Sequence, residues 1–229
     1  DYIVNFAAES HVDNSISNGL PFVRTNVEGT FNLVELAKNL KRLKKFIHVS
    51  TDHYGTTSSE VRNELMDPIP VNSYGYSKLA GERLVLNESP AALILRTNFF
   101  GVSASGNHSI LDFAVDSLNG ASPVYGYEDV WFSPLGVTQI GRFLEKALEG
   151  DLAGVLNLTG TESITKLDSL RAVAVALELD PNRVIPAKSS NFSSLVSRPT
   201  NLSLDNSKLR SLGVELPALR DMIEEELSY

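Results

Sequence analysis

The sequence predicts an α/β protein whose core is a doubly wound parallel sheet. Short apolar runs that suit buried strands lie at residues 2–8, 45–50 and 91–96, and longer segments with helical periodicity separate them. Alternation of strands and helices predicts parallel strands in one sheet, with helices on both faces. The carboxyl ends of such strands meet at one edge of the sheet, and this edge is where ligands bind.

The first half of the chain supplies most of the predicted sheet. Its elements are a strand at 2–8, a helix at 21–43, a strand at 45–50, a loop at 52–72, a helix at 74–87 and a strand at 91–96. The first run contains Ile3 and Val4 and predicts a central strand that is buried on both faces. The apolar positions of 21–43 fall on one broad helical stripe. The glycines and prolines of 52–72 predict a loop.

The second half is more mixed. Its elements are a helix at 108–118, a strand at 123–127, a loop at 131–134, a helix at 138–149, a strand at 154–158, and helices at 166–178, 207–212 and 215–227. Helix 138–149 is apolar at Ile140, Phe143 and Ala147, which share one face. These short elements predict a mixed α/β region instead of a continued regular alternation.

The composition limits the classes of function. The net charge is −8, and the one basic cluster, 38–45, is short, which argues against a nucleic-acid partner. We interpret that cluster as the solvated end of a helix. The sequence has no cysteine, which excludes thiol catalysis, disulfides and cysteine metal sites, and we expect no metal site. No apolar run reaches the ~18 residues that span a bilayer and no signal peptide opens the sequence, so we expect a cytoplasmic protein with no membrane partner.

The most informative motif is Tyr74-Gly-Tyr-Ser-Lys78, which follows the run Val49-Ser-Thr-Asp52. On a helix, positions i and i+4 share one face, so the Lys78 ammonium can reach toward the Tyr74 phenol. A phenol with a pKa near ~10 needs roughly 4 kcal/mol of preferential phenolate stabilisation to reach a pKa of about 7, and a nearby cation acts in that direction. Such a pair also arises by chance at a helix edge. Here the preceding strand ends in hydroxyl residues, so Thr51 can converge on the tyrosine and form an acid/base site.

Further motifs accompany this pair along the chain. In order they are Asn5-Phe-Ala-Ala-Glu-Ser-His-Val-Asp13, Thr25-Asn-Val-Glu-Gly-Thr-Phe-Asn-Leu-Val34, Val49-Ser-Thr-Asp52, Tyr74-x-x-x-Lys78 and Arg96-Thr-Asn-Phe-Phe-Gly101. On these motifs the chain resembles the extended short-chain dehydrogenase/reductase family, in its nucleotide-sugar branch. The segment Arg198-Pro-Thr-Asn-Leu-Ser-Leu-Asp-Asn-Ser-Lys-Leu209 is similar to the ending of the dTDP-4-dehydrorhamnose reductases. The resemblance covers essentially the whole chain.

The resemblance implies a Rossmann-type sheet and an organisation in two parts. Residues 1–100 are then part of an NAD(P)-binding domain that carries the catalytic residues. Residues 101–229 are then a smaller substrate-binding lobe that is interleaved with the end of the sheet. The resemblance also implies NADPH or NADH as the cofactor and a nucleotide sugar as the substrate, and it allows a homodimer.

The resemblance assigns roles to particular residues. The catalytic residues are Thr51, Tyr74 and Lys78. Tyr74 donates a proton, Lys78 lowers the pKa of Tyr74 and holds the nicotinamide ribose, and Thr51 bonds the substrate oxygen. The expected cofactor-binding residues are Ala7, Ala8, Asn26, Ser50, Tyr74, Lys78 and Asn98. The expected substrate-binding residues are Asp52, Phe99, Trp131 and Arg198.

Several of these residues have a second, structural interpretation. Ordinary core packing equally explains Ala7, Ala8, Phe99 and Trp131. Asn26 either supports the strand loops and the cofactor or is an incidental polar residue. Arg198 either contacts a phosphate, because its guanidinium suits an oxyanion, or anchors its loop, with Asp205 or Asn206 capping the helix that follows.

The chain departs from its relatives at His53. Sugar 4,6-dehydratases carry Thr-Asp-Glu where this chain has Thr51-Asp52-His53, and the loop is one residue shorter before Tyr54. The missing glutamate counts against elimination, because a reductase needs only a hydride and one proton on oxygen. We therefore expect NAD(P)H-dependent reduction of a nucleotide-linked 4-keto-6-deoxy sugar. His53 either tunes the site or has no role.

Two alternative functions stay open. The dehydratase-like segment 5–13 keeps a nucleotide-sugar epimerase or dehydratase in view. A non-catalytic regulatory protein on the same fold, similar to the regulatory subunit of methionine adenosyltransferase, is disfavoured because Thr51, Tyr74 and Lys78 occur together.

The sequence contains no Gly-x-x-Gly-x-x-Gly turn, the motif that cradles the dinucleotide pyrophosphate in the family. This absence favours the regulatory alternative. We interpret it, together with the first residue Asp1, as the sign of a chain that lacks the front strands of the sheet. From these residues alone we expect weak dinucleotide binding and no reductase activity.

Overall fold

The main sheet has four parallel strands in the order β1-β2-β3-β8. The protein is seen here in a computed structural model that describes residues 1–10, 18–55, 60–103, 109–191 and 199–229. The strands are β1 (Tyr2–Asn5), β2 (Lys45–Val49), β3 (Leu93–Arg96) and β8 (Gly154–Asn157). Since helices connect these parallel strands, the predicted α/β class is confirmed.

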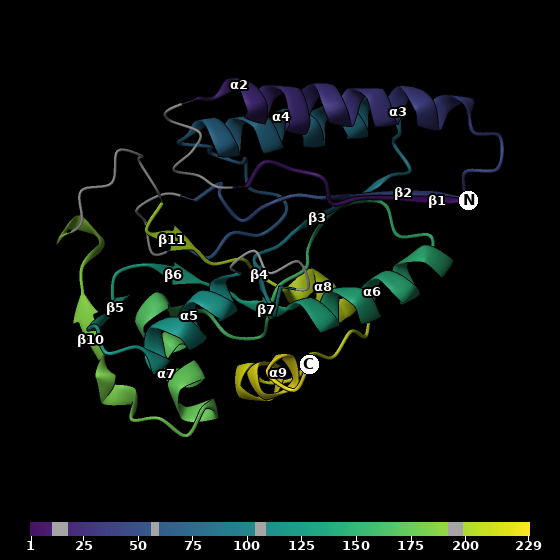
Figure 1. Cartoon of the computed structure of the whole chain (residues 1–229). Helices are drawn as coiled ribbons and strands as arrows, with labels where there is room; N and C mark the ends of the chain where they lie inside the picture. Colours follow the sequence, from purple (N-terminus) through teal and green to yellow (C-terminus); the bar gives the residue numbers. More distant parts are fainter. Residues whose placement is uncertain (11–17, 56–59, 104–108, 192–198) are drawn as a thin grey trace.

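Helices cover both faces of this sheet (Figure 1). The layer above the sheet in that view consists of α2 (Leu20–Phe22), η1 (Val23–Gly29), α3 (Thr30–Asn39) and α4 (Ser73–Glu88). The layer below it contains α6 (Val137–Glu149), α8 (Ser207–Ser211) and α9 (Leu219–Glu226). The sheet is therefore doubly wound, as predicted. None of the helices in the described ranges is long and apolar enough to cross a membrane.

Residues of the central strands alternate between the two helical layers. Phe46 and Ile94 pack in one core with Val34 of α3, whereas Ile47 packs in the other core with Ile140 of α6. Successive side chains of a strand point to opposite faces, so a strand between two layers needs apolar residues at most positions. This requirement explains the continuous apolar runs that revealed these strands.

The remaining elements form a mixed α/β region, called the mixed lobe below, whose apolar residues share one core with the main sheet. Its short strands are β4 (Phe99–Phe100), β5 (Val124–Tyr127), β6 (Trp131–Phe132), β7 (Leu135–Gly136), β9 (Ile164–Thr165), β10 (Val184–Ala187) and β11 (Asn201–Leu202). They pair as β10-β5, β11-β6-β9 and β4-β7. Its helical segments are α5 (Ile110–Asn119), α7 (Lys166–Ala176), η2 (Pro181–Arg183) and η3 (Ser189–Asn191). Because α6 and β8 return to the main sheet between these elements, the lobe shares its chain with the sheet.

The first strand is shorter than predicted. It ends at Asn5 instead of residue 8, because the Asn5 Oδ1 accepts a hydrogen bond from the Ala7 backbone N–H at 3.1 Å and turns the chain out of the sheet. The strand is also an edge of the described sheet, and Tyr2 is 45% exposed. The prediction of a central strand is therefore wrong for the described residues, although Ile3 and Val4 are partly buried and pack against the cores on opposite faces of the sheet.

The predicted helix 21–43 is a helical segment at 20–39 that contains a π-helical stretch, η1. The segment ends at Leu40, which has an extended backbone. Asn26 is the buried residue of the π-helical stretch. π-Helical stretches inside α-helices often occur at functional sites. Apolar periodicity does not reveal a single widened turn, which explains why the sequence predicted a regular helix.

Short strands account for the other differences. The predicted loop 131–134 contains β6, in which Trp131 pairs with Asn201 and Thr165, and β10 was not predicted. Strands of two to four residues depend on partners that are distant in the chain, so local patterns give little sign of them.

Of the two capping residues that the sequence suggested, Asp205 accepts a hydrogen bond from the Ser207 backbone N–H at 2.7 Å.

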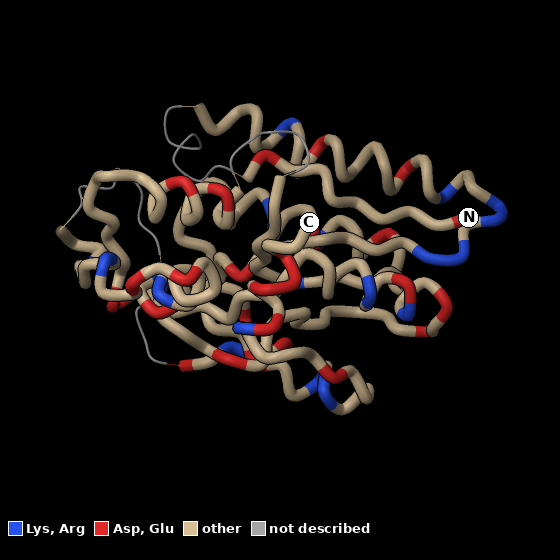
Figure 2. Tube along the Cα trace, turned by 60° about the horizontal axis from the view of Figure 1, so that its bottom comes forward, with Lys and Arg blue, Asp and Glu red and all other residues tan. Residues whose placement is uncertain are grey.

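The basic cluster 38–45 lies where α3 ends and β2 begins, beside the N-terminus in Figure 2. Lys38 forms exposed ion pairs with Glu35 and Glu88, each at 2.6 Å, as expected of a solvated helix end. Lys45 differs, because it is buried and its Nζ donates to the Gly150 carbonyl oxygen at 2.9 Å. Acidic and basic residues are otherwise dispersed in that view.

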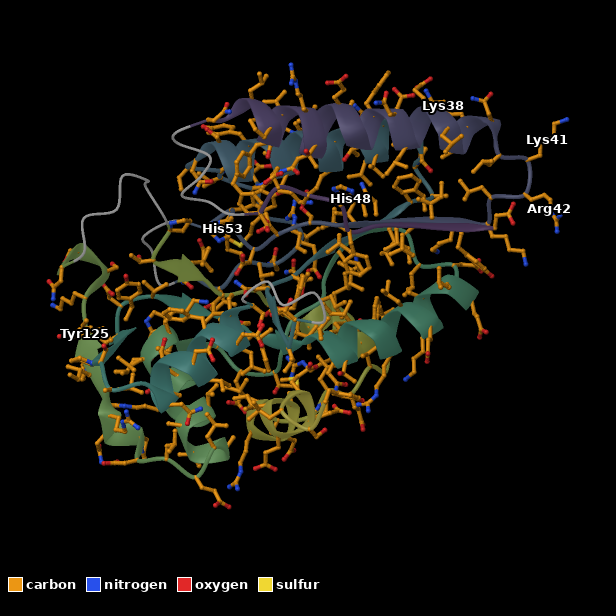
Figure 3. All side chains as sticks on the ribbon, in the orientation of Figure 1. Lys38, Lys41, Arg42, His48, His53 and Tyr125 are labelled. Atoms are coloured by element: carbon orange, nitrogen blue, oxygen red, sulfur yellow. The ribbon has the colours of Figure 1, made fainter. Side chains whose placement is uncertain are left out.

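His48 is a buried titratable group in the middle of β2. It is 1% exposed, and Figure 3 shows it between the sheet and the layer of α4. Burial, and to a lesser extent the Lys78 ammonium, lowers the pKa of His48 from 6.5 to about 3. The imidazole is therefore neutral in the folded protein at neutral pH. Its Nδ1 lies 3.2 Å from the Asn5 Nδ2, which can donate to it.

We expect this histidine to make the fold acid-sensitive. The depressed pKa contributes stability that is complete above pH 6.5 and is lost as the pH falls toward about 3, because the unfolded chain binds the proton first. Between about pH 7.5 and about pH 5 the loss amounts to about 2 kcal/mol. In His48→Gln most of this loss of unfolding free energy should disappear, as measured by urea unfolding at both pH values. His53→Gln, in the loop after the same strand, is the control and should show the same loss as wild type. Equal pH dependence in wild type and His48→Gln would contradict this account.

Candidate active site

Helix α4 carries Tyr74 and Lys78 one turn apart on the face that meets the sheet. The helix starts after Asn72, whose Oδ1 accepts a hydrogen bond from the Gly75 backbone N–H at 2.9 Å and caps the first turn. Tyr74 is 9% exposed and Lys78 is 3% exposed. Both side chains thus point away from bulk solvent, as the i, i+4 spacing allows.

Thr51 meets the Tyr74 phenol from the carboxyl end of β2. Thr51 is buried, and its hydroxyl interacts with the phenol and lowers the pKa of Tyr74. The same hydroxyl accepts a hydrogen bond from the His53 backbone N–H at 3.2 Å. The Tyr74 ring makes edge contacts with Phe22, at 6.4 Å between ring centroids, and with His53, at 5.3 Å. These contacts fix the phenol at the end of the strand.

The protonation of Tyr74 differs from the sequence prediction. Burial raises the pKa of Tyr74 to about 12, and the Asp52 charge raises it as well, while the hydrogen bond from Thr51 lowers it. Lys78 does not bring the pKa toward neutrality, because its Nζ donates to the Val49 carbonyl oxygen at 2.7 Å and the burial of the phenol prevails. Tyr74 therefore keeps its proton at neutral pH and can act as a proton donor.

Lys78 is a buried cation at the carboxyl end of β2. Burial lowers the pKa of Lys78 from 10.5 to about 8, and the Glu82 carboxylate opposes this shift. The side chain is therefore mostly charged at neutral pH. An ammonium has three donor hydrogens and the Val49 carbonyl takes one, so Lys78 has donors for ligand oxygens.

Asp52 and Asn98 contact each other across the ends of β2 and β3. The Asn98 Nδ2 donates to the Asp52 Oδ2 at 2.6 Å, and Asp52 is 2% exposed. The other carboxylate oxygen lies 3.9 Å from the His53 Nε2. The structure thus brings together one residue expected to bind substrate and one expected to bind cofactor. Both lie next to the loop that holds Thr51.

Asn26 ties the loop after β1 to helix α4. Its Oδ1 accepts a hydrogen bond from the Glu9 backbone N–H at 2.9 Å, and its Nδ2 donates to the Glu9 carbonyl at 3.1 Å and to the Ser77 Oγ at 2.9 Å. The Ser77 Oγ in turn donates to the Tyr74 carbonyl at 2.8 Å. A Cβ at Gly81 would lie 2.9 Å from the Asn26 carbonyl oxygen, so the glycine permits this close packing. Asn26 is not an incidental polar residue.

The other expected cofactor residues lie at strand ends with different surroundings. Ala7 is exposed and Ala8 is half-buried in the loop after β1, so core packing does not explain Ala7. The Ser50 Oγ lies 3.0 Å from the Tyr54 Oη, and Ser50 is 6% exposed. Its hydroxyl thus contacts an interior side chain.

Two of the expected substrate residues, Phe99 and Trp131, are aromatic and exposed. Phe99 is 41% exposed in β4 and Trp131 is 44% exposed in β6, which argues against an ordinary core role for either. Arg198 lies outside the described residues, so both of its interpretations remain predictions.

Sequence reasoning gave no role to three buried residues near the site: Tyr54, Glu82 and Arg96. The Arg96 guanidinium donates to the Glu82 carboxylate, with Nε at 3.1 Å and Nη2 at 2.8 Å, and lies 5.0 Å from the centre of the Tyr54 ring. Two signals were available. Glu82 follows Lys78 by one helical turn, and Arg96 is a charge in an otherwise apolar strand, which requires a partner.

Comparison with known proteins finds relatives over the whole chain. The family described as RmlD substrate binding domain matches residues 1–228. The chain is 29% identical over 227 residues to the trifunctional UDP-glucose 4,6-dehydratase/UDP-4-keto-6-deoxy-D-glucose 3,5-epimerase/UDP-4-keto-L-rhamnose-reductase of Arabidopsis thaliana. The alignment covers 93% of this chain and 33% of that protein. It is also 29% identical over 231 residues to the dTDP-4-dehydrorhamnose reductase of Mycolicibacterium smegmatis. That alignment covers 98% of this chain and 68% of the relative.

A solved structure shares the fold. The dTDP-4-dehydrorhamnose reductase of Bacillus anthracis, in complex with NADP, superposes with a TM-score of 0.90 at 21% identity, over 99% of this chain and 80% of that chain. The chain spans about a third of the length of the Arabidopsis proteins that it matches, 33% in each case.

Loss of the Asn26 side chain should loosen this site measurably. Asn26→Ala removes the partner of the half-buried Glu9 backbone and of the buried Ser77 hydroxyl, so we expect the free energy of unfolding to fall by about 3 kcal/mol. Asn39→Ala, on the same helical segment, removes one exposed hydrogen bond to the Glu35 carbonyl. This variant should change the free energy of unfolding by less than about 0.5 kcal/mol. Urea unfolding of both variants measures the difference. Similar losses in the two would show that the Asn26 bonds do not hold the site together.

Proposed function

The chain belongs to the RmlD substrate binding domain family, and we propose on this premise that the protein that contains it performs NAD(P)H-dependent reduction of a nucleotide-linked 4-keto-6-deoxy sugar. Two relatives carry such an activity in their names, a dTDP-4-dehydrorhamnose reductase and a protein with UDP-4-keto-L-rhamnose-reductase activity. The reaction adds a hydride to the ketone carbon and a proton to the ketone oxygen. It therefore needs a protonated acid and a site for a nicotinamide.

The observation that carries the proposal is the meeting of Thr51, Tyr74 and Lys78 at the carboxyl end of β2. The three residues are buried, and the Thr51 hydroxyl interacts with the Tyr74 phenol. The ends of parallel strands are the usual ligand sites of such sheets. A protonated phenol, a second hydroxyl and a cation at that edge are the groups that carbonyl reduction requires.

Tyr74 is the proton donor in this proposal. Its pKa of about 12 keeps the phenol protonated at neutral pH. As negative charge develops on the ketone oxygen, that oxygen becomes more basic than a phenolate and takes the proton from the Tyr74 Oη. The Thr51 hydroxyl, which interacts with the phenol, orients the same oxygen and stabilises its charge.

The residues present fit the nicotinamide half of a dinucleotide. The Lys78 ammonium has donors for ribose hydroxyls besides the one that the Val49 carbonyl takes. Ala7 is small and exposed beside the end of β1, which leaves the backbone there accessible. A bound nicotinamide supplies the hydride. NADP is bound in the Bacillus anthracis reductase, and for this chain NADPH and NADH remain the two predicted cofactors.

The substrate side of the proposal uses the ends of β2 and β3 and the mixed lobe. Asp52 and Asn98 form a fixed polar pair next to Thr51, which suits sugar hydroxyls. The exposed rings of Phe99 and Trp131 suit stacking against a sugar or a base. We accordingly propose that residues 1–100 carry the cofactor and catalytic groups and that 101–229 form the substrate lobe. A homodimer and a cytoplasmic location stay predictions of the sequence.

Elimination, the dehydratase alternative, fits the site less well. It needs an acid and a base to remove water across two ring carbons. Asp52 is engaged by Asn98, and the next residue is His53 instead of a second carboxylate. The regulatory alternative is disfavoured because Thr51, Tyr74 and Lys78 occur together and are all buried at the end of β2.

The test is an assay of the protein that contains these 229 residues. It is mixed with a dTDP-linked 4-keto-6-deoxy sugar and NADPH or NADH, and the loss of reduced nicotinamide absorbance and the sugar product are measured together. We expect stoichiometric formation of a 6-deoxy sugar with a C4 hydroxyl. Cofactor binding without turnover of any keto sugar would favour the regulatory alternative.

Tyr74→Phe should reduce turnover by about two to four orders of magnitude, the usual effect of losing a general acid, with cofactor affinity nearly unchanged. Lys78→Ala should reduce both turnover and cofactor affinity, because Lys78 also donates to the ribose. Steady-state kinetics and cofactor titration of each variant separate the two roles. Tyr76→Phe, an exposed tyrosine of the same helix, is the matched control and should behave as wild type. A mild effect of Tyr74→Phe would contradict the assignment.

Incubation with dTDP-glucose and oxidised cofactor should yield no 4-keto-6-deoxy product, because His53 provides no carboxylate for the C5 proton. His53→Glu should not by itself create a dehydratase, since the loop is also one residue shorter than in those enzymes. Chromatography of the sugar nucleotides gives the result. Elimination by the unmodified protein would overturn the reductase proposal.

A further inference from the structure

A cluster of buried charges lies behind the candidate active site. Arg96 of β3 donates to the carboxylate of Glu82 on α4, with Nε at 3.1 Å and Nη2 at 2.8 Å, and the two side chains are 8% and 2% exposed. The guanidinium also lies 5.0 Å from the centre of the Tyr54 ring, and the Tyr54 Oη lies 3.0 Å from the Ser50 Oγ. The cluster therefore joins α4 to β3 and to the loop that follows β2.

The cluster is adjacent to Lys78. Glu82 lies four residues after Lys78, so the two side chains share one face of α4. His48 of β2 also faces Lys78 across the sheet–helix boundary, but its imidazole is neutral. Arg96 forms an ion pair with Glu82, with its Nη2 2.8 Å from the Glu82 Oε2. Burial lowers the pKa of Lys78 to about 8, and Glu82 is the charged group that opposes this effect.

The geometry suggests why a charged pair is kept in this position. A buried ion pair is often no more stable than well-packed apolar residues of the same volume. Apolar residues, however, provide no negative charge near a buried ammonium. The Val49 carbonyl is a neutral partner, and a buried amine with only a neutral partner tends to lose its proton.

We propose that Glu82, anchored by Arg96 and Tyr54, is a positioning residue that keeps Lys78 charged and holds its face of α4 against the ends of β2 and β3. Glu82 acts through Lys78 and does not itself touch the reacting groups. Arg96 fixes the carboxylate through two parallel hydrogen bonds, and such a fork defines orientation as well as distance.

The consequence for the reaction rests on the proposed reductase function. A charged ammonium is a stronger hydrogen-bond donor to ribose oxygens than a neutral amine. Loss of the Glu82 charge should therefore weaken cofactor binding most at pH values between the lowered pKa of Lys78 in the variant and its pKa of about 8 in the wild type, because only the wild-type amine is charged there.

The test measures the charge of Lys78 directly, without substrate or cofactor. The ε-nitrogen signal of Lys78 is followed by NMR against pH in ¹⁵N-lysine-labelled protein and is assigned by its loss in Lys78→Met. In Glu82→Gln we expect the pKa of Lys78 to fall by about two units, the effect of one charge about 6 Å away at an effective dielectric constant of about 20. Glu82→Asp should restore most of the shift. Glu226→Gln is the matched control, since this buried glutamate of α9 bonds the Thr138 backbone N–H on the other face of the sheet, and it should leave the pKa of Lys78 unchanged.

A second variant covers the case in which Glu82→Gln does not fold because Arg96 loses its partner. Glu82→Gln/Arg96→Gln replaces the pair by neutral side chains of similar shape and should also lower the pKa of Lys78, by less than the single variant. An unchanged pKa of Lys78 in the folded variants, or an equal shift in Glu226→Gln, would overturn the inference. A lowered pKa in a protein that reduces no keto sugar would refute the proposed function and leave this inference supported.

Discussion

Helix α4 meets the sheet through polar and charged side chains as much as through apolar ones, and the position of the candidate site depends on this contact. Ser77, Lys78 and Glu82 are buried on its inner face together with Leu79 and Val85. A purely apolar face would allow the helix to slide, because apolar contacts are non-directional. Hydrogen bonds and ion pairs have preferred distances and angles, so they fix one register.

Two networks hold α4 from opposite sides. Asn26 links Ser77 to the loop after β1, and Arg96 links Glu82 to β3. Tyr74 extends from the first turn of the same helix and reaches the end of β2. Because both networks are buried, a disturbance in either one should move the phenol relative to Thr51.

The electrostatics of the site follow from burial. The same desolvation that keeps the Tyr74 phenol protonated lowers the pKa of Lys78 and keeps His48 neutral. A proton donor benefits from that environment, whereas a cation requires compensation from a nearby negative charge. The arrangement suits a reaction that places a proton on oxygen at neutral pH.

The sequence by itself determined the parallel sheet, its doubly wound helices and the spacing of Thr51, Tyr74 and Lys78, because apolar periodicity and short motifs are local properties. It also indicated Asn26 as a supporting residue. Only the tertiary structure decided where the Lys78 ammonium points, how burial sets the pKa of Tyr74, and that Arg96 meets Glu82. It also decided the short strands of the mixed lobe. These features depend on segments that are distant in the chain and on the exclusion of water around them, and neither is written in a local pattern of residues.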